Sequence, residues 1–149
     1  MIENPKLQKG HLQRAKAFLC WDKFPMLSIQ LVPIKGQVGY FFPPRHDYSQ
    51  IVLFYSDHND EFSDAIFLLF HEIGHYIQYN HYAEVGQSSE FSLLVEKDKG
   101  PQKMAFEKES WQLGSQVLIE FLGKEKIAAE GVLLAFNRFA EKSILTYSD

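Results

Sequence analysis

Apolar side chains recur every three or four positions between residues 62 and 80, and this spacing predicts a helix there. Its main apolar stripe consists of Ala65, Ile66, Leu69, Phe70, Ile73 and Ile77. Phe67 and Leu68 add apolar side chains beside the stripe, so most of the helix surface is apolar. A helix of this kind is expected to lie buried in the middle of a domain. Polar residues at 56–60 are expected to cap its N-terminus.

The segments before this helix show shorter patterns. Residues 5–20 have the spacing of an amphipathic helix, and residues 27–32 alternate between apolar and polar side chains, as a half-buried strand does. A turn at 33–36 is followed by an apolar segment at 38–42, which we expect to return as a second strand. A third strand is expected at 51–55, directly before the central helix.

Two further helices are predicted after the central one, at residues 104–122 and 125–145. The expected core positions of the last helix are Ile127, Leu133, Leu134, Phe136 and Phe139. Residues 82–103 contain Gly, Ser and charged residues and predict a long irregular connection, of the kind that is often functional. The order of helix, strands and helices predicts an α+β fold with a three-stranded, mostly antiparallel sheet.

The composition is that of one domain spanning residues 1–149. Hydrophobic residues make up 46% of the chain and aromatic residues 15%, enough for one good core. The net charge of −4 argues against direct binding to nucleic acid. No stretch is long and apolar enough to span a membrane, and the first residues lack a signal-peptide pattern. A single cysteine, Cys20, can form no internal disulfide, so we expect a cytoplasmic protein.

Five residues of the central helix, His71-Glu72-Ile73-Gly74-His75, form the H-E-x-x-H pattern of zinc peptidases. Residues four apart lie on one helix face, so His71 and His75 can share one metal ion. Glu72 lies at the edge of that face, where its carboxylate can accept a proton from water on the metal. Zinc lowers the pKa of such a water toward neutrality, which supplies a nucleophile.

A catalytic zinc site needs a third protein ligand and an open fourth position. One candidate is His81, which has the ligand spacing of the metzincins. Those enzymes carry glycine at the position of Gln78, so that the helix breaks there. Because Gln78 is no helix breaker, a continuous helix would carry His81 away from the metal. The alternative interpretation of His81 is a surface histidine just past the end of the helix.

The second candidate for the third ligand, Glu107, belongs to the helix predicted at 104–122. One face of that helix contains Glu107, Ser110, Trp111, Gly114, Leu118 and Phe121. Glu107 is the only carboxylate on this face, and a buried charge needs a cation. Ser110 and Gly114 are small enough to let two helices approach closely, whereas Glu109 falls on the opposite, solvated face. The alternative role of Glu107 is to complement the positive end of the helix dipole.

With these motifs the sequence resembles the ImmA/IrrE group of small zinc metallopeptidases. That group carries H-E-L-G-H and then a helix of the form E-x-x-A-x-x-x-A, where this chain has H-E-I-G-H at 71–75 and E-x-x-S-x-x-x-G at 107–114. Trp111 stands where a small polar residue is common in the group. The resemblance covers residues 25–122 and implies a zincin-like, gluzincin-type domain, in which the H-E-x-x-H helix packs on the Glu-bearing helix and on a C-terminal helix.

The resemblance implies that His71, His75 and Glu107 bind one zinc ion and that Glu72 is the general base. Members of the group are bacterial or phage-borne, are often encoded on mobile elements, and some cleave a transcriptional repressor. We therefore expect a zinc-dependent peptidase with a protein substrate, lying along an edge strand within 38–55. The alternative is a non-catalytic, zinc-stabilised regulatory module that binds a protein partner. An intermediate possibility is a peptidase that is silent until a partner orders residues 82–103.

Three tyrosines lie close to the motif in the sequence, at Tyr76, Tyr79 and Tyr82. A tyrosine near a zinc site can stabilise the oxyanion of a tetrahedral intermediate. Most aromatic side chains near a helix end serve packing, so none of the three is singled out.

Overall fold

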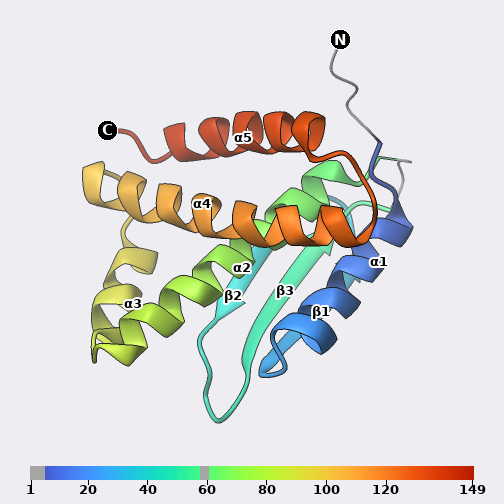
Figure 1. Cartoon of the computed structure of the whole chain (residues 1–149). Helices are drawn as coiled ribbons and strands as arrows, with labels where there is room; N and C mark the ends of the chain where they lie inside the picture. Colours follow the sequence, from blue (N-terminus) through green and yellow to red (C-terminus); the bar gives the residue numbers. More distant parts are fainter. Residues whose placement is uncertain (1–5, 58–60) are drawn as a thin grey trace.

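The computed structural model describes residues 6–57 and 61–149 and confirms the α+β class (Figure 1). Its elements, in chain order, are α1 (Lys9–Ala17), a π-helical segment η1 (Phe18–Lys23), β1 (Leu27–Pro33), β2 (Val38–Phe42), β3 (Ser49–Tyr55), α2 (Ser63–Glu84), α3 (Ser88–Glu96), α4 (Pro101–Lys124) and α5 (Ala129–Leu145). The predicted helices and strands therefore all form, with helix and strand ends shifted by a few residues.

The strands form one mixed sheet in the order β1-β3-β2. β1 runs parallel to β3, with Leu27 opposite Ser49, and β2 runs antiparallel to β3, with Val38 opposite Phe54. The prediction of a mostly antiparallel sheet, in which the first two strands are neighbours, is corrected here. β3 takes the central position because its inward side chains, such as Ile51 and Leu53, are fully buried, as a central strand requires.

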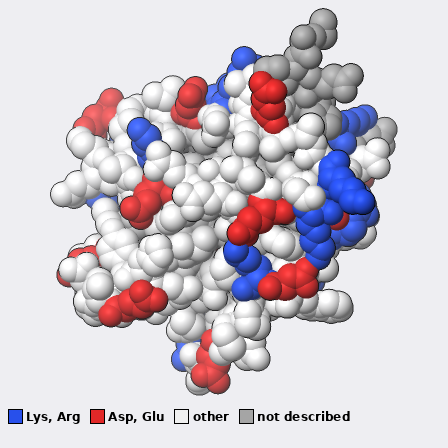
Figure 2. All heavy atoms as spheres, in the orientation of Figure 1, with Lys and Arg blue, Asp and Glu red and all other residues white. Residues whose placement is uncertain are grey.

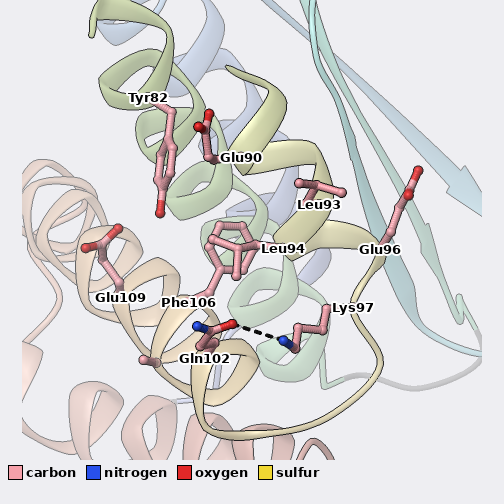
Figure 3. Close-up of a pocket in the computed structure, with 10 residues that line it drawn as sticks. Tyr82, Glu90, Leu93, Leu94, Glu96, Lys97, Gln102, Phe106 and Glu109 are labelled. Carbon is pink, nitrogen blue, oxygen red and sulfur yellow. Dashed lines mark hydrogen bonds between the residues drawn. The ribbon is translucent and has the colours of Figure 1, made fainter. Parts of the chain in front are cut away.

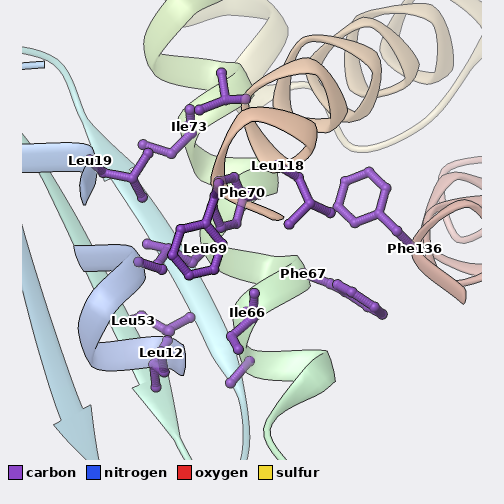
Figure 4. Close-up of a cluster of buried hydrophobic side chains, with 14 of the residues drawn as sticks. Leu12, Leu19, Leu53, Ile66, Phe67, Leu69, Phe70, Ile73, Leu118 and Phe136 are labelled. Atoms are coloured by element: carbon purple, nitrogen blue, oxygen red, sulfur yellow. The ribbon is translucent and has the colours of Figure 1, made fainter. Parts of the chain in front are cut away.

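The hydrophobic core lies between the sheet and the helices, with α2 at its centre. Figure 4 shows Ile66, Leu69 and Phe70 of α2 facing Leu12 of α1 and Leu53 of β3. On the other side of α2, Phe67 packs edge-on against Phe136 of α5, with ring centroids 5.4 Å apart. The prediction of a buried central helix is thus confirmed, since α2 is covered by the sheet, α1, α4 and α5.

The segment predicted as an irregular connection, residues 82–103, is mostly helical. α2 continues to Glu84, and α3 follows at Ser88–Glu96. α3 is held by Phe91, which is buried and packs edge-on against Phe41, Tyr79 and Phe106. The charged and serine residues around Phe91 dominate the local composition, so the anchoring residue is visible only in the tertiary contacts.

Other local predictions have mixed outcomes. Phe136 of α5 is fully buried as expected, but Leu134 is exposed, and Val132 takes a core position instead. The helix predicted at 5–20 begins at Lys9, and residue 5 lies outside the described residues. Of the expected cap at 56–60, residues 58–60 also lie outside them, while Asp57 accepts a hydrogen bond from Lys9 at 2.9 Å.

Charged side chains of both signs are mixed on the face shown in Figure 2, and blue and red groups lie side by side on its right. Three ion pairs connect the first helical segments to the end of α4: Arg14 with Glu125 at 2.7 Å, Lys23 with Glu120 at 2.6 Å, and Asp22 with Lys124. No helix within residues 6–57 and 61–149 has the length and apolar character needed to cross a membrane.

Candidate metal centre

The candidate site is built where α2 and α4 cross at close range. A Cβ atom added to Gly74 would lie 1.8 Å from the carbonyl oxygen of Ser110, and one added to Gly114 would lie 2.1 Å from the carbonyl oxygen of Phe70. Backbone therefore meets backbone at two points, and only glycine fits at either. This close approach brings one turn of α4 against the histidine face of α2, as the small residues at 110 and 114 suggested.

Three buried side chains converge at the crossing: His71 and His75 from α2 and Glu107 from α4. Their ligand atoms all lie within 4.8 Å of one another. The Nε2 atom of His71 is 3.2 Å from one carboxylate oxygen of Glu107, and the Nε2 atom of His75 is 3.2 Å from the other. The sequence-predicted ligand set is therefore brought together in space, in an arrangement that could hold a metal ion.

The separations fit a metal site. Ligands about 2.1 Å from a tetrahedral ion lie about 3.4 Å apart, close to the distances between Glu107 and the two imidazoles. The donor set of two imidazole nitrogens and one carboxylate is one that transition metals bind. A carboxylate this deeply buried also needs compensating positive charge. Lys103 supplies part of it, with its Nζ atom 3.6 Å from a Glu107 oxygen.

Electrostatics couple the three groups. Burial alone would raise the pKa of the Glu107 carboxyl, but hydrogen bonds to His71 and His75 outweigh burial and hold that pKa well below its usual range. Burial lowers the pKa of His71. Burial acts the same way on His75, but its hydrogen bond to Glu107 and the charges of Glu107 and Glu72 prevail and raise its pKa. Glu107 is therefore ionised and available as a ligand at neutral pH.

Glu72 is buried beside the triad and lines a cavity of about 400 Å³ together with the three ligand residues. The opposite wall of this cavity is β2, which contributes residues 38–41. A Cβ atom added to Gly39 would lie 2.9 Å from Cγ of Glu72, so the strand runs directly over this side chain. The Glu72 carboxylate is thus placed at the boundary between the metal position and the space beside β2.

The structure distinguishes Glu107 from the other residues considered as the third ligand. α2 continues through Gln78 to Glu84, so His81 stays on the helix surface, where it is exposed. Glu109 is exposed on α4, as its place on the helical wheel predicts, although it accepts a hydrogen bond from Gln78 at 2.9 Å. Glu107 is therefore the carboxylate that meets the histidines.

Sequence reasoning missed three residues of the site. Gln78 is fully buried, and its Oε1 atom lies 2.8 Å from Nδ1 of His75. Lys103 is also buried and donates to the carbonyl oxygens of Leu94 and Val95 at the end of α3, at 3.0 and 2.9 Å. Because Lys103 also lies beside Glu107, its two hydrogen bonds connect the end of α3 to the candidate metal centre. The one available signal for Lys103 was its i, i+4 spacing from Glu107.

The third missed residue is Tyr147, which follows α5 and lines the same cavity. Burial raises the pKa of Tyr147 to about 12, with further contributions from the carboxylates of Glu107 and Glu72. The tyrosines near the motif lie elsewhere: Tyr76 packs against Phe24, with ring centroids 5.1 Å apart, and Tyr82 lines a groove beside α3. Tyr147 was not recognisable in the sequence because it lies far from the motif along the chain.

That groove, about 800 Å³ in volume, is formed by α3, the start of α4 and the end of α2 (Figure 3). Leu94 and Phe106 lie in its middle, and Glu90, Glu96 and Glu109 stand around it. Its lining contains none of the three ligand residues, but it adjoins the site through Phe106, whose ring stacks on that of His75 with centroids 5.2 Å apart.

Comparisons of the chain with protein-family models, with curated proteins and with solved structures found no match. The function is therefore inferred from the geometry of the site and from the motifs that form it.

Proposed function

We propose that this chain is a zinc-dependent metallopeptidase of the ImmA/IrrE type. The observation that carries the proposal is the buried convergence of His71, His75 and Glu107, with Glu72 beside them in a cavity. His71, His75 and Glu107 would hold the zinc ion. Zinc bound there would act as a Lewis acid, activating water and polarising the scissile carbonyl.

Glu72 is the proposed general base. Its carboxylate is next to His71 in the helix yet faces the cavity, where it can accept a proton from the attacking water and pass it to the leaving amine. Its burial limits competition from bulk solvent for that proton. Tyr147 lines the cavity with a protonated phenol, which is a suitable donor to an oxyanion.

We propose that the substrate is a protein segment that lies along β2. Among the described strands, β2 has a neighbour on one side only, β3, so its other edge is free to pair with an extended peptide. The same strand forms the wall of the cavity opposite the triad. A substrate paired to β2 would therefore pass directly over Glu72. The resemblance favours a regulatory protein such as a repressor as substrate.

We place this reaction in the cytoplasm, since the chain has a single cysteine, Cys20, and no disulfide to protect. Burial raises the pKa of the Cys20 thiol, which makes it a poor nucleophile. The hydrolytic role is accordingly assigned to the metal centre.

The test compares wild-type protein with Glu72→Gln, both loaded with zinc, on a proteome-derived peptide library whose cleavage products are read by mass spectrometry. The amide keeps the shape of Glu72 but cannot accept the proton. We expect equal zinc content and cleavage lower by about 100- to 10,000-fold in the variant. Equal cleavage by both proteins would contradict the assignment of Glu72. Zinc binding without any cleavage by the wild type would favour the regulatory-module alternative.

A further inference from the structure

Each histidine of the triad has a buried polar partner on the ring nitrogen that points away from Glu107. The Nδ1 atom of His75 is 2.8 Å from Oε1 of Gln78, and the Nδ1 atom of His71 is 3.1 Å from Oγ of Ser110. Both partners are 0% exposed. Buried hydrogen bonds of this kind are costly to lose and have fixed donors and acceptors, so their direction can be worked out.

The direction of the bond between Gln78 and His75 follows from the other contact of the amide. The Nε2 atom of Gln78 lies 2.8 Å from the carbonyl oxygen of Phe106, which can only accept. This atom must therefore be the NH2 nitrogen, and Oε1 of Gln78 must be the acceptor that faces His75. The Nδ1 atom of His75 consequently carries a hydrogen and donates it to Gln78.

The same reasoning applies to Ser110 and His71. The Ser110 hydroxyl donates its single hydrogen to the backbone carbonyl oxygen of His71, at 2.8 Å. Toward the imidazole the hydroxyl can then only accept, so the Nδ1 atom of His71 must donate. Each ring is also held face-on by an aromatic side chain, with Trp111 stacked 4.1 Å from His71. The corresponding neighbour of His75 is Phe106.

We propose that Gln78 and Ser110 are positioning residues that accept from Nδ1 of His75 and of His71, so that Nδ1 keeps its hydrogen and Nε2 is the nitrogen of each ring that binds the metal. The proposal rests on the metal-binding part of the proposed function and not on peptidase activity. A neutral imidazole has two tautomers, and the partner of one nitrogen decides which nitrogen is left to bind metal. The two acceptors fix the orientation of both rings, so that metal binding does not have to reorient them.

The first measurement needs no variant. Nitrogen chemical shifts of isotope-labelled histidine in zinc-loaded wild-type protein report directly which ring nitrogen keeps its hydrogen. We expect the Nδ1–H form at both His71 and His75. The Nε2–H form at either residue would overturn the proposal, whether or not the protein cleaves a peptide.

The second measurement uses two variants that control for each other. Gln78→Met keeps an unbranched side chain of similar length but cannot accept from His75, and Ser110→Ala removes the acceptor of His71. We expect Gln78→Met to change the tautomer signal of His75 alone and Ser110→Ala that of His71 alone. Zinc affinity, read by competition with a chromophoric chelator, should fall by about 10- to 100-fold in each variant.

A changed tautomer with zinc affinity within twofold of wild type would overturn the proposal. Wild-type protein that binds zinc in the expected tautomers but cleaves nothing would support it while contradicting the peptidase. If wild-type protein bound no zinc at all, that result would contradict the metal site, on which both the proposed peptidase and the positioning proposal depend.

Discussion

The two walls of the cavity are built in opposite ways. On the side of α2 and α4, the side chains that hydrogen-bond to the histidines are all buried, and the helices meet backbone to backbone at Gly74 and Gly114. On the side of β2 the wall is a sheet edge, and its side chains Val38 and Tyr40 are 40% and 48% exposed. The first wall surrounds the candidate ligands with closely packed groups, whereas the second leaves space for a substrate.

This difference separates two requirements of a hydrolytic metal site. The metal ligands must be fixed to within a fraction of an ångström, which rigid, closely packed helices achieve. The substrate must enter and leave, which an open edge allows and a closed bundle does not. Glu72 belongs to the helical wall but lies against Gly39 of the open one, so it is the residue at which the two walls meet.

The largest effect is expected on zinc affinity, when the proposed ligand of α4 is removed from the helical wall. Glu107→Ala removes one of the three proposed ligands and leaves the two imidazoles without their carboxylate. Zinc affinity should fall by about a thousandfold, equivalent to roughly 4 kcal/mol. Competition with a chelator and metal analysis after dialysis both measure this change.

Two matched variants test whether position rather than charge decides this outcome. Glu109→Ala removes a carboxylate two residues away that touches Gln78 but no histidine, and we expect no more than a few-fold loss of zinc affinity. His81→Ala should retain full affinity, since His81 lies exposed on the helix. A loss at either position as large as that for Glu107→Ala would place the ligand elsewhere.

The next effect is on the helix crossing itself. Gly114→Ala places a methyl group 2.1 Å from the carbonyl oxygen of Phe70, and neither backbone can yield without separating the helices. We expect a loss of about 3 kcal/mol in the free energy of unfolding, measured on metal-free protein by denaturant titration.

The control for Gly114→Ala lies in the same helix. No described atom would lie within 4 Å of a Cβ at Gly123, so Gly123→Ala should be neutral or stabilising by up to about 1 kcal/mol. Equal destabilisation by the two substitutions would mean that the close crossing does not decide the effect, since helix propensity alone favours alanine over glycine.

The helical wall could be predicted from the sequence because its information is local. The i, i+4 spacing of His71 and His75 sets one face of α2, and the single carboxylate on the apolar face of α4 identifies Glu107. Small residues at 110 and 114 even indicated how closely the helices approach. The sequence indicated only one role of Gln78, that it does not break the helix. Its contact with Nδ1 of His75 was found only in the structure.

The open wall could be predicted only in part: the sequence indicated the strand at 38–42, but the contacts of this wall join distant parts of the chain. Strand order depends on which strand best tolerates burial on both edges, and the turn at 33–36 gave no sign that β3 would come between β1 and β2. α3 depends on Phe91 meeting aromatic side chains from β2, α2 and α4. Tyr147 reaches the cavity only because α5 returns across the molecule.

A third prediction concerns the point where the two walls meet. Gly39→Ala places a methyl group 2.9 Å from Cγ of Glu72, so the Glu72 side chain must shift while the three ligands keep their positions. We expect peptide cleavage to fall by about 10- to 100-fold, mainly in kcat, because a small misplacement of a catalytic group is costly. Zinc affinity should stay within a few-fold of wild type, and a parallel loss of zinc would show that the walls are not independent.

The smallest effect is expected at Tyr147 on the open wall. Below pH 10 the phenol keeps its proton in both the folded and the unfolded chain, so it adds no pH dependence there. Between pH 10 and the folded-state pKa of about 12, the unfolded chain releases the proton and the folded chain does not, so stability falls as pH rises. Since Tyr147 is partly exposed, we expect this loss to be about 1 kcal/mol.

Tyr147→Phe should therefore remove about 1 kcal/mol of the alkaline loss of stability in metal-free protein, measured by denaturant titration across this pH range. Zinc sharpens the test, because a cation held by His71, His75 and Glu107 would favour the phenolate and lower the pKa of Tyr147. A titration of tyrosinate absorbance with and without zinc, with Tyr147→Phe identifying the signal, measures that change. If zinc did not change the pKa of Tyr147, the phenol would not face the metal position. That result would contradict the proposed role of Tyr147 as a donor to the oxyanion.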